Sequence, residues 1–238
     1  HLVSNCNNSL ILANNINDYN ENLKFNSSTK LISTSVIEKY FFYKRLDTCL
    51  NKNITILFVG RLDSFKGFEN VIKSFIDLNQ KGFNITLNLV GQTVDERLLK
   101  KMITKVEKAK LSRSINRLGY IAGSSKLIDL YRSSDIFVNA SKFTEGFPRT
   151  IYEAFSNSLP VITTSVGGIG YQLKHNIDSI FCESDNHLSI SKSIIGLITD
   201  SKLRRKIIRN GYKIAKEHTA DKNTKKIANY IKHWYQNH

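Results

Sequence analysis

The chain has 238 residues, of which 41% are hydrophobic, enough for a globular protein with a substantial core. Lysine and arginine number 35 against 20 acidic residues, so a formal net charge of +15 favours polyanionic partners such as nucleic acid, an anionic membrane or a diphosphate. The three cysteines are odd in number and far apart, which excludes a disulfide framework or a cysteine-based zinc site and fits reduced, cytoplasmic thiols. No apolar run approaches the roughly 20 residues of a membrane helix, so none is expected to span a bilayer.

Residues 1–52 are rich in asparagine and weakly patterned. Short apolar runs at 10–13 and 31–36 predict two strands, and an aromatic run, 40–43, follows them. The chain opens on His1, without an initiator methionine and without the basic and apolar segments of a signal peptide. We therefore expect a fragment or a processed product.

From residue 54 onward, apolar runs of strand length alternate with amphipathic stretches of helical period. The strand-like runs are continuously apolar, as expected for parallel strands covered on both faces. This alternation predicts an α/β fold with a doubly wound parallel sheet. The expected strands cover 54–59, 85–90, 115–118, 135–140, 161–163 and 179–182, and the expected helices cover about 68–78, 95–109, 124–133, 148–155, 188–198 and 202–217.

The tail from about residue 222 predicts one more helix, amphipathic and in need of a covering surface. Its apolar positions follow the spacing i, i+3, i+4 and i+7 of a single helix face. They are Ile227, Tyr230, Ile231 and Trp234.

Basic residues concentrate on two helical stretches, at 97–117 and 204–206. They do not interleave with exposed aromatic residues as a single-strand-binding groove would, and no nucleic-acid docking motif is present, so nucleic acid is not an expected partner. Two interpretations stay open for this charge: a solvated basic face, or peripheral contact with an anionic membrane at the inner face of the plasma membrane.

The most informative stretch is residues 139–168, NASKFTEGFPRTIYEAFSNSLPVITTSVGG. Its pattern indicates a strand end, a loop, a helix, a strand and a glycine-rich turn, with Pro148 where a helix can begin. In an open parallel sheet, ligands bind beyond the carboxyl ends of the strands. Glu145 is therefore expected in a crevice loop, and Glu153, eight residues later, two turns into the helix and within reach of the same crevice.

A second loop follows the strand expected at 54–59, with the sequence GRLDSFKG. It places two cations, Arg61 and Lys66, on one loop at the carboxyl end of a strand. Fixed positive groups at such a place suit a ligand on which negative charge develops, for example a departing diphosphate. Gly91, at the end of the next strand, fits either a close backbone approach or a plain turn.

Together, the two loops resemble the G-R-L-x-x-x-K-G and E-x7-E motifs of retaining nucleotide-sugar glycosyltransferases with the GT-B fold, the group 1 or family 4 enzymes. The resemblance covers roughly residues 53–220, the length of the C-terminal, donor-binding half of such an enzyme, and implies a Rossmann-like domain. It implies that residues 1–52 are a remnant of the N-terminal acceptor domain with a linker. Residues 221–238 would be the helix that crosses back to that domain.

The resemblance also implies roles for individual residues. Glu145 would be the catalytic glutamate, which positions the donor or supports it electrostatically. Arg61 and Lys66 would bind the donor diphosphate, and Glu153 would accept hydrogen bonds from the ribose. The further implied contacts are Gly146, Phe147, Pro148, Arg149 and Thr150 with the donor sugar and phosphate, and Tyr120 and Ile121 with the nucleobase.

No metal or other cofactor is expected. The chain has no Asp-x-Asp pair of the kind metal-dependent transferases use, and its six histidines show no metal-binding spacing. The positive end of the helix at 148–155 would support the diphosphate instead. The expected co-substrate is a UDP- or GDP-linked sugar.

The leading hypothesis is a hexosyl- or glycosyltransferase that builds a bacterial surface polysaccharide, such as capsule or the O-antigen of lipopolysaccharide. The expected acceptor is a glycan or a lipid-linked glycan. Two alternatives stay open: a nucleotide-sugar epimerase on the same fold, or a fragment that binds a nucleotide sugar without turnover. The second follows because a GT-B active site lies between two domains, and most of one is absent from these residues.

Overall fold

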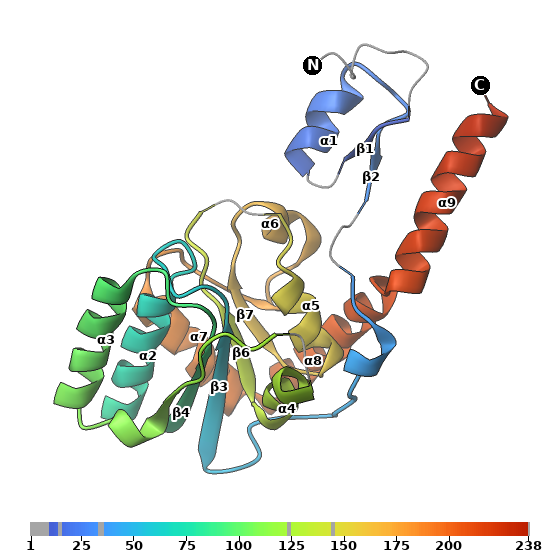
Figure 1. Ribbon diagram of the computed structural model, residues 1–238. Helices are drawn as coiled ribbons and strands as arrows, with labels where there is room; N and C mark the ends of the chain where they lie inside the picture. The colour runs from blue at the N-terminus through green and yellow to red at the C-terminus, as the bar shows by residue number, and fades with distance from the viewer. Residues whose placement is uncertain (1–9, 14–15, 33–35, 123–124, 144–145, 238) are drawn as a thin grey trace.

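A computed structural model describes residues 10–13, 16–32, 36–122, 125–143 and 146–237 (Figure 1). Its centre is a six-stranded sheet in the order β5-β4-β3-β6-β7-β8, in which all neighbouring strands are parallel. The predicted doubly wound α/β fold is therefore confirmed. The strands are β3 (Asn53–Val59), β4 (Asn84–Val90), β5 (Ile115–Arg117), β6 (Ile136–Asn139), β7 (Val161–Thr164) and β8 (Ile180–Cys182).

Helices cover both faces of the sheet and produce two apolar cores. Side chains alternate between these cores along β3, since Ile56 and Phe58 pack into the first and Leu57 into the second. The first core lies under α2 (Phe68–Gln80), α3 (Glu96–Lys108) and α7 (His187–Thr199), and the second under α4 (Ser125–Ser133), α5 (Arg149–Ser156) and α8 (Ser201–Glu217).

The N-terminal residues form a separate small unit, drawn above the main sheet in Figure 1. The two expected strands are much shorter than predicted: β1 (Leu12–Ala13) and β2 (Lys30–Leu31) form a two-residue parallel pair, and residues 33–35 lie outside the described part. A helix that the apolar pattern did not indicate, α1 (Ile16–Leu23), connects them. The aromatic run that follows contains a 3-10 turn, η1 (Lys39–Phe41), whose Phe41 packs into the second core.

The predicted terminal helix is present as α9 (Ala220–Gln236), and it buries none of its residues. It projects away from the sheet toward the N-terminal unit (Figure 1). Backbone hydrogen bonds hold its start, because Ile37 donates to the His218 carbonyl and Ala220 donates to the Ile37 carbonyl. The glycine-rich turn after β7 contains a further short helix, α6 (Gly168–Gln172).

Candidate functional site

The strand order puts the first strand of the sheet, β3, beside the fourth, β6, so the chain connections leave these two strands in opposite directions. Such a switch point opens a crevice at the carboxyl ends of the two strands, where ligands bind in doubly wound sheets. The loops that border it are residues 60–67 after β3 and 140–148 after β6. Both loops singled out in the sequence therefore border one crevice.

The two crevice loops are fixed against each other through their backbones. Lys142 donates its backbone N–H to the carbonyl of Phe65 at 2.8 Å. Gly67, with φ of 65°, has its backbone so near β6 that a Cβ there would lie 2.2 Å from the Ala140 carbonyl oxygen. Only glycine fits this position, for both its conformation and its contact.

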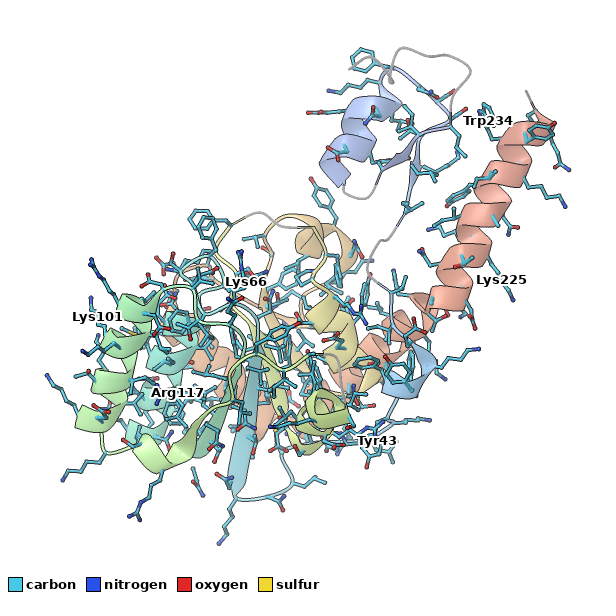
Figure 2. All side chains as sticks on the ribbon, in the orientation of Figure 1. Tyr43, Lys66, Lys101, Arg117, Lys225 and Trp234 are labelled. Atoms are coloured by element: carbon cyan, nitrogen blue, oxygen red, sulfur yellow. The ribbon has the colours of Figure 1, made fainter. Side chains whose placement is uncertain are left out.

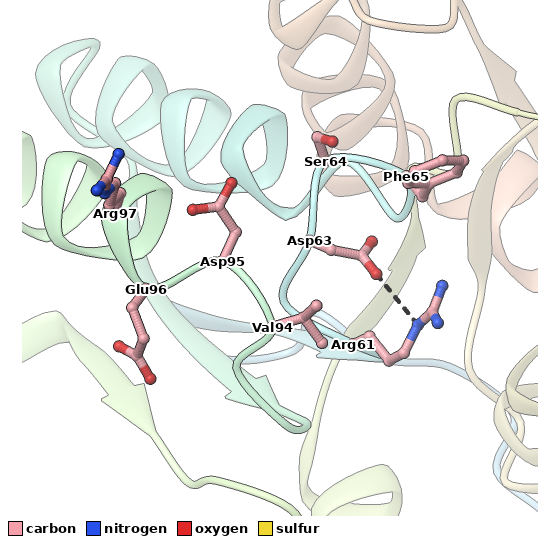
Figure 3. A pocket seen from close by; sticks show the side chains of 8 residues that line it. All are labelled: Arg61, Asp63, Ser64, Phe65, Val94, Asp95, Glu96 and Arg97. Atoms are coloured by element: carbon pink, nitrogen blue, oxygen red, sulfur yellow. Dashed lines mark ion pairs between the residues drawn. The ribbon is translucent and has the colours of Figure 1, made fainter.

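Asp63 organises the loop after β3. Its Oδ1 accepts the backbone N–H of Lys66 at 2.9 Å, and its Oδ2 lies 3.1 Å from Arg61 Nε (Figure 3). Asp63 is only 7% exposed, whereas the Arg61 side chain is 60% exposed. Because the carboxylate holds Arg61 by Nε, both terminal nitrogens of the guanidinium remain available for a planar, bidentate anion.

The role of Asp63 was not predicted from the sequence. The signal was present, since an Asp three residues before a loop Lys matches a side chain that accepts a backbone N–H further along the turn. Lys66, on the same loop, is half-buried and lies at the same end of the sheet as Arg61 (Figure 2).

The loops after β4 and β5 complete one side of the crevice. Gly91 has φ of 149°, and a Cβ there would lie 1.8 Å from the Gly60 carbonyl oxygen, so a close backbone approach explains this glycine. The Gly91 N–H donates to the Gly119 carbonyl at 2.8 Å. This bond anchors the loop with the two expected nucleobase contacts: Tyr120 is 74% exposed, and Ile121 packs partly against the second core.

The loop after β6 continues directly into α5. Residues 144 and 145, and with them the predicted catalytic Glu145, lie outside the described residues. Gly146 lies against the glycine-rich turn, because a Cβ on Gly168 would meet its carbonyl carbon and oxygen at 3.2 Å. Pro148 is extended and precedes α5 without a side-chain cap, so the first backbone N–H groups, at Arg149 and Thr150, belong to an uncapped helix start.

Aromatic rings anchor this loop from behind. The Phe147 ring stacks on Tyr152 of α5, with centroids 4.3 Å apart and planes at 29°. Tyr152 stacks in turn on His218, at 4.4 Å. The Phe147 side chain therefore packs toward the protein, and its backbone borders the crevice.

Glu153 is more enclosed than the sequence suggested, at 6% exposed. Tyr131 donates its hydroxyl to Oε2 at 2.8 Å, and Arg149 Nε lies 3.1 Å from Oε1. Burial raises the pKa of Glu153, against the opposing effects of the Tyr131 hydrogen bond and the Arg149 charge. Contact between this carboxylate and a ribose stays a prediction, and Arg149 would have to move aside for it.

A hollow of about 590 Å³ lies beside the crevice, between the loops after β3 and β4 (Figure 3). Of the predicted site residues, only Arg61 lines it. Its other charged groups are the carboxylates of Asp63, Asp95 and Glu96 with one further cation, Arg97, so it is poorly suited to an anion. The full lining is Arg61, Asp63, Ser64, Phe65, Val94, Asp95, Glu96 and Arg97.

The described part of the chain contains neither a candidate metal site nor a candidate membrane span. No group of three or more His, Cys, Asp or Glu side chains there could hold a metal ion. No helix there is both long enough and apolar enough to cross a bilayer.

Comparison with known proteins identifies the class and then the family. The fold is the Rossmann-like half of a GT-B enzyme. The isolated C-terminal domain of the group 1 glycosyl transferase LpcC from Francisella tularensis matches it with a TM-score of 0.68 and 27% identity. The match covers 77% of this chain and 99% of the LpcC domain. The family model described as "Glycosyl transferases group 1" matches residues 47–214. The chain belongs to this family.

Among proteins of known sequence, the capsular polysaccharide biosynthesis glycosyltransferase CapM from Staphylococcus aureus is 31% identical over 164 residues, 69% of this chain. The chain spans only 42% of the length of CapM. HepE from Anabaena, solved with UDP and glucose, has the same fold with a TM-score of 0.78 at 20% identity, covering 94% of this chain and 63% of HepE.

Proposed function

We propose that the chain is the donor-binding half of a retaining glycosyltransferase that uses a nucleotide-diphosphate sugar. The observation that carries this proposal is the placement of Arg61 and Lys66 on one loop at the switch point, opposite the uncapped start of α5. HepE, which shares the fold, was solved with UDP and with UDP-glucose, which supports a UDP-linked donor over a GDP-linked one.

In this proposal, the acceptor hydroxyl oxygen attacks the anomeric carbon while the bond from that carbon to the diphosphate breaks, and the hydroxyl proton passes to the departing diphosphate oxygen. The guanidinium of Arg61, the ammonium of Lys66 and the N–H groups at the start of α5 stabilise the negative charge on the leaving diphosphate. These fixed groups take the place of a metal ion, so we propose a metal-independent reaction. Glu145 supports the donor sugar, and attack on the same face as the leaving group gives retention.

The backbone of residues 146–148 would meet the sugar hydroxyls, and the loop with Tyr120 and Ile121 would frame the base. Glu153 would bind the ribose once the donor displaces Arg149 from its carboxylate. Two of these groups are held from behind, since Phe147 stacks on Tyr152 and Glu153 accepts from Tyr131, and this rigidity supports the proposal.

We further propose that the acceptor is a glycan or lipid-linked glycan of a bacterial surface polysaccharide. Support comes from the similarity to CapM, named for capsular polysaccharide biosynthesis. Residues 1–52 would be the end of the acceptor domain with the linker, 53–220 the donor domain, and 221–238 the helix returning to the acceptor domain. Because the chain spans less than half of CapM, these 238 residues alone would bind the donor without transferring the sugar.

Calorimetric titration with UDP, GDP and UDP-glucose, in the presence of a metal chelator, tests the proposal. We expect saturable binding of UDP that the Lys66→Ala and Glu153→Ala substitutions both weaken. Absence of binding to any of these ligands by folded wild-type protein, or binding that both variants retain unchanged, would contradict it. A sugar-transfer assay with a chain extended to the length of CapM tests the contribution of the missing half separately.

A further inference from the structure

Helix α8 carries an unbroken stripe of positive charge on its outer face. Six cations lie within an arc of about 100° and extend over about 21 Å of helix, from the geometry of 100° and 1.5 Å per residue. No acidic residue occurs between Ser201 and Lys216. All six are exposed: Lys202, Arg205, Lys206, Arg209, Lys213 and Lys216.

The stripe faces away from the protein because the opposite face of α8 is packed tightly. Gly211 lies so near α5 that a Cβ there would be 2.3 Å from the Phe155 ring. Arg204 belongs to this inner face, 3% exposed and bonded to Asp47, although sequence analysis grouped it with the basic run at 204–206. That interpretation is wrong for Arg204, which contributes nothing to the surface charge.

Most of the stripe lacks a neutralising partner. Lys202, Lys206, Arg209 and Lys213 form no ion pair with any described residue. Arg205 lies 3.4 Å from Asp47, a carboxylate that already serves Arg204. Close like charges repel one another and gain most from an extended anionic surface that contacts all of them.

The N-terminal part of the stripe is hollowed. A depression of about 440 Å³ is lined by Lys202, Arg205, Lys206 and Arg209, with Leu203 in its wall and Asp200 at its end. This volume, with four cations among its six lining residues, suits a single phosphate-bearing headgroup. The remaining cations continue along the helix as further contacts for neighbouring headgroups.

The other basic helix, α3, provides a useful contrast. Its first residue is Glu96, and Glu107 lies among its lysines on the exposed surface. At 100° per residue, its five cations lie within an arc of about 140°, and the two carboxylates lie together at one edge of that arc, so the face carries a net charge of only +3. The α8 stripe is narrower, carries six cations and has no acidic residue between Ser201 and Lys216.

We propose that the α8 stripe docks the protein on a bilayer of anionic phospholipid. A bilayer fits better than single-stranded nucleic acid because the stripe has no exposed aromatic ring for stacking. Tyr212, beside the stripe, packs edge-on against Phe42, and its ring face meets Lys216. Attraction between juxtamembrane lysines and anionic lipid is strong enough for a stripe of six to bind measurably. The docking is independent of nucleotide binding, because α8 contributes no side chain to the crevice.

Co-sedimentation with vesicles tests the proposal, using phosphatidylcholine alone or phosphatidylcholine with one third phosphatidylglycerol. Wild-type protein is expected to bind only the anionic vesicles, with affinity that falls as salt rises. The triple variant Lys206→Glu, Arg209→Glu, Lys213→Glu is expected to bind at least about 100-fold more weakly, at about fivefold for each cation lost. Circular dichroism and UDP titration of the same variant verify that folding and the crevice are unchanged.

The matched control carries the same charge change on α3: Lys100→Glu, Lys101→Glu, Lys105→Glu. It is expected to keep most of the vesicle affinity. An equal loss in both variants would attribute binding to net charge and overturn the proposal. Tighter binding to a short DNA duplex than to anionic vesicles, lost in the α8 variant, would assign the stripe to nucleic acid and also overturn it.

Discussion

The two ends of the parallel sheet use charged residues in opposite ways. At the amino ends of the strands, Arg45 donates to the carbonyls of Arg132, Ser134 and Asn157, where α4 and α5 end. At the carboxyl ends, Arg61 has one carboxylate partner and an otherwise exposed guanidinium.

Other charges at the amino end follow the same pattern as Arg45. Asp135 accepts the backbone N–H groups of Cys49 and Thr55. Arg204 donates to Asp47 and to the Leu197 and Ile198 carbonyls at the end of α7. Helix ends and strand starts leave backbone groups without partners, and buried charges satisfy them there. Charge at the amino end therefore stabilises the fold. At the carboxyl end, Asp63 and the pair of Lys142 with Glu69 are structural as well, but the guanidinium of Arg61 is oriented by Asp63 and remains largely exposed.

The largest expected effect comes from breaking the amino-end pair with Asp47→Ala. Arg204 would keep its buried charge without a counterion, so the free energy of unfolding should fall by about 3–5 kcal/mol in urea denaturation. The exposed pair of Lys81 and Asp77 is the control, and Lys81→Ala should cost less than about 1 kcal/mol. Similar small losses of unfolding free energy in the Asp47→Ala and Lys81→Ala variants would contradict a stabilising role for charge at the amino end of the sheet.

The same pair predicts acid sensitivity. Burial acts to raise the pKa of Asp47, but hydrogen bonds from Arg204 and the Thr48 backbone outweigh it and hold the pKa below its ordinary value. A depressed folded-state pKa gives stability that is present above the unfolded pKa of about 3.9 and is lost as pH falls through the folded value. Asp47→Ala should therefore flatten the acid limb of a stability-versus-pH curve.

The close approach of the crevice loops gives the next largest effect. Gly91→Ala must accommodate a Cβ against the Gly60 carbonyl as well as an unfavourable φ, so we expect a loss of about 2–4 kcal/mol. Gly82→Ala is the control, since Gly82 also has positive φ, 88°, but nothing within 4 Å of its Cβ position. It should cost only the conformational strain, about 1–2 kcal/mol. Equal melting temperatures for the two variants would argue against the close approach.

Arg61→Ala should lower the free energy of unfolding by only about 1–2 kcal/mol, because the arginine is exposed, although its loss leaves the buried Asp63 carboxylate with only the Lys66 N–H as a partner. The dissociation constant for UDP should nevertheless rise about 10- to 100-fold through loss of charge-assisted hydrogen bonds. Paired denaturation and titration measurements check both parts. A variant that loses stability and retains UDP affinity would reverse the roles assigned to the two ends.

The smallest effect concerns Glu153. Burial raises its pKa, so its stabilising protonated form is fully present below the unfolded pKa of about 4.3 and is lost as pH rises through the folded value. Glu153→Gln mimics the protonated form and can still accept from Tyr131, so stability should change by less than about 1 kcal/mol at neutral pH. In this variant, the free energy of unfolding should no longer decline as pH rises just above 4.3. A decline that persists would implicate another titrating group.

Sequence patterns predicted the carboxyl end of the sheet much better than the amino end. Arg61 and Lys66 share a short loop after a clear strand, so local spacing was enough to place them. Arg45 and Asp47 bind partners more than 80 residues away, and no local pattern indicates such pairs. Burial of Glu153 was missed for the same reason, since Tyr131 comes from a different helix.

The most direct test of the central claim is the effect of UDP on thermal stability in the presence of a chelator. Wild-type protein should gain stability as UDP rises, by about 2.7 kcal/mol at one hundred times its dissociation constant. The double variant Arg61→Ala, Lys66→Ala should remain folded without UDP, with a somewhat lower melting temperature than wild type because Asp63 loses its partner, and should gain little stability from UDP. Equal gains in both proteins, or none in the wild type, would contradict the assignment of these carboxyl-end cations to a diphosphate.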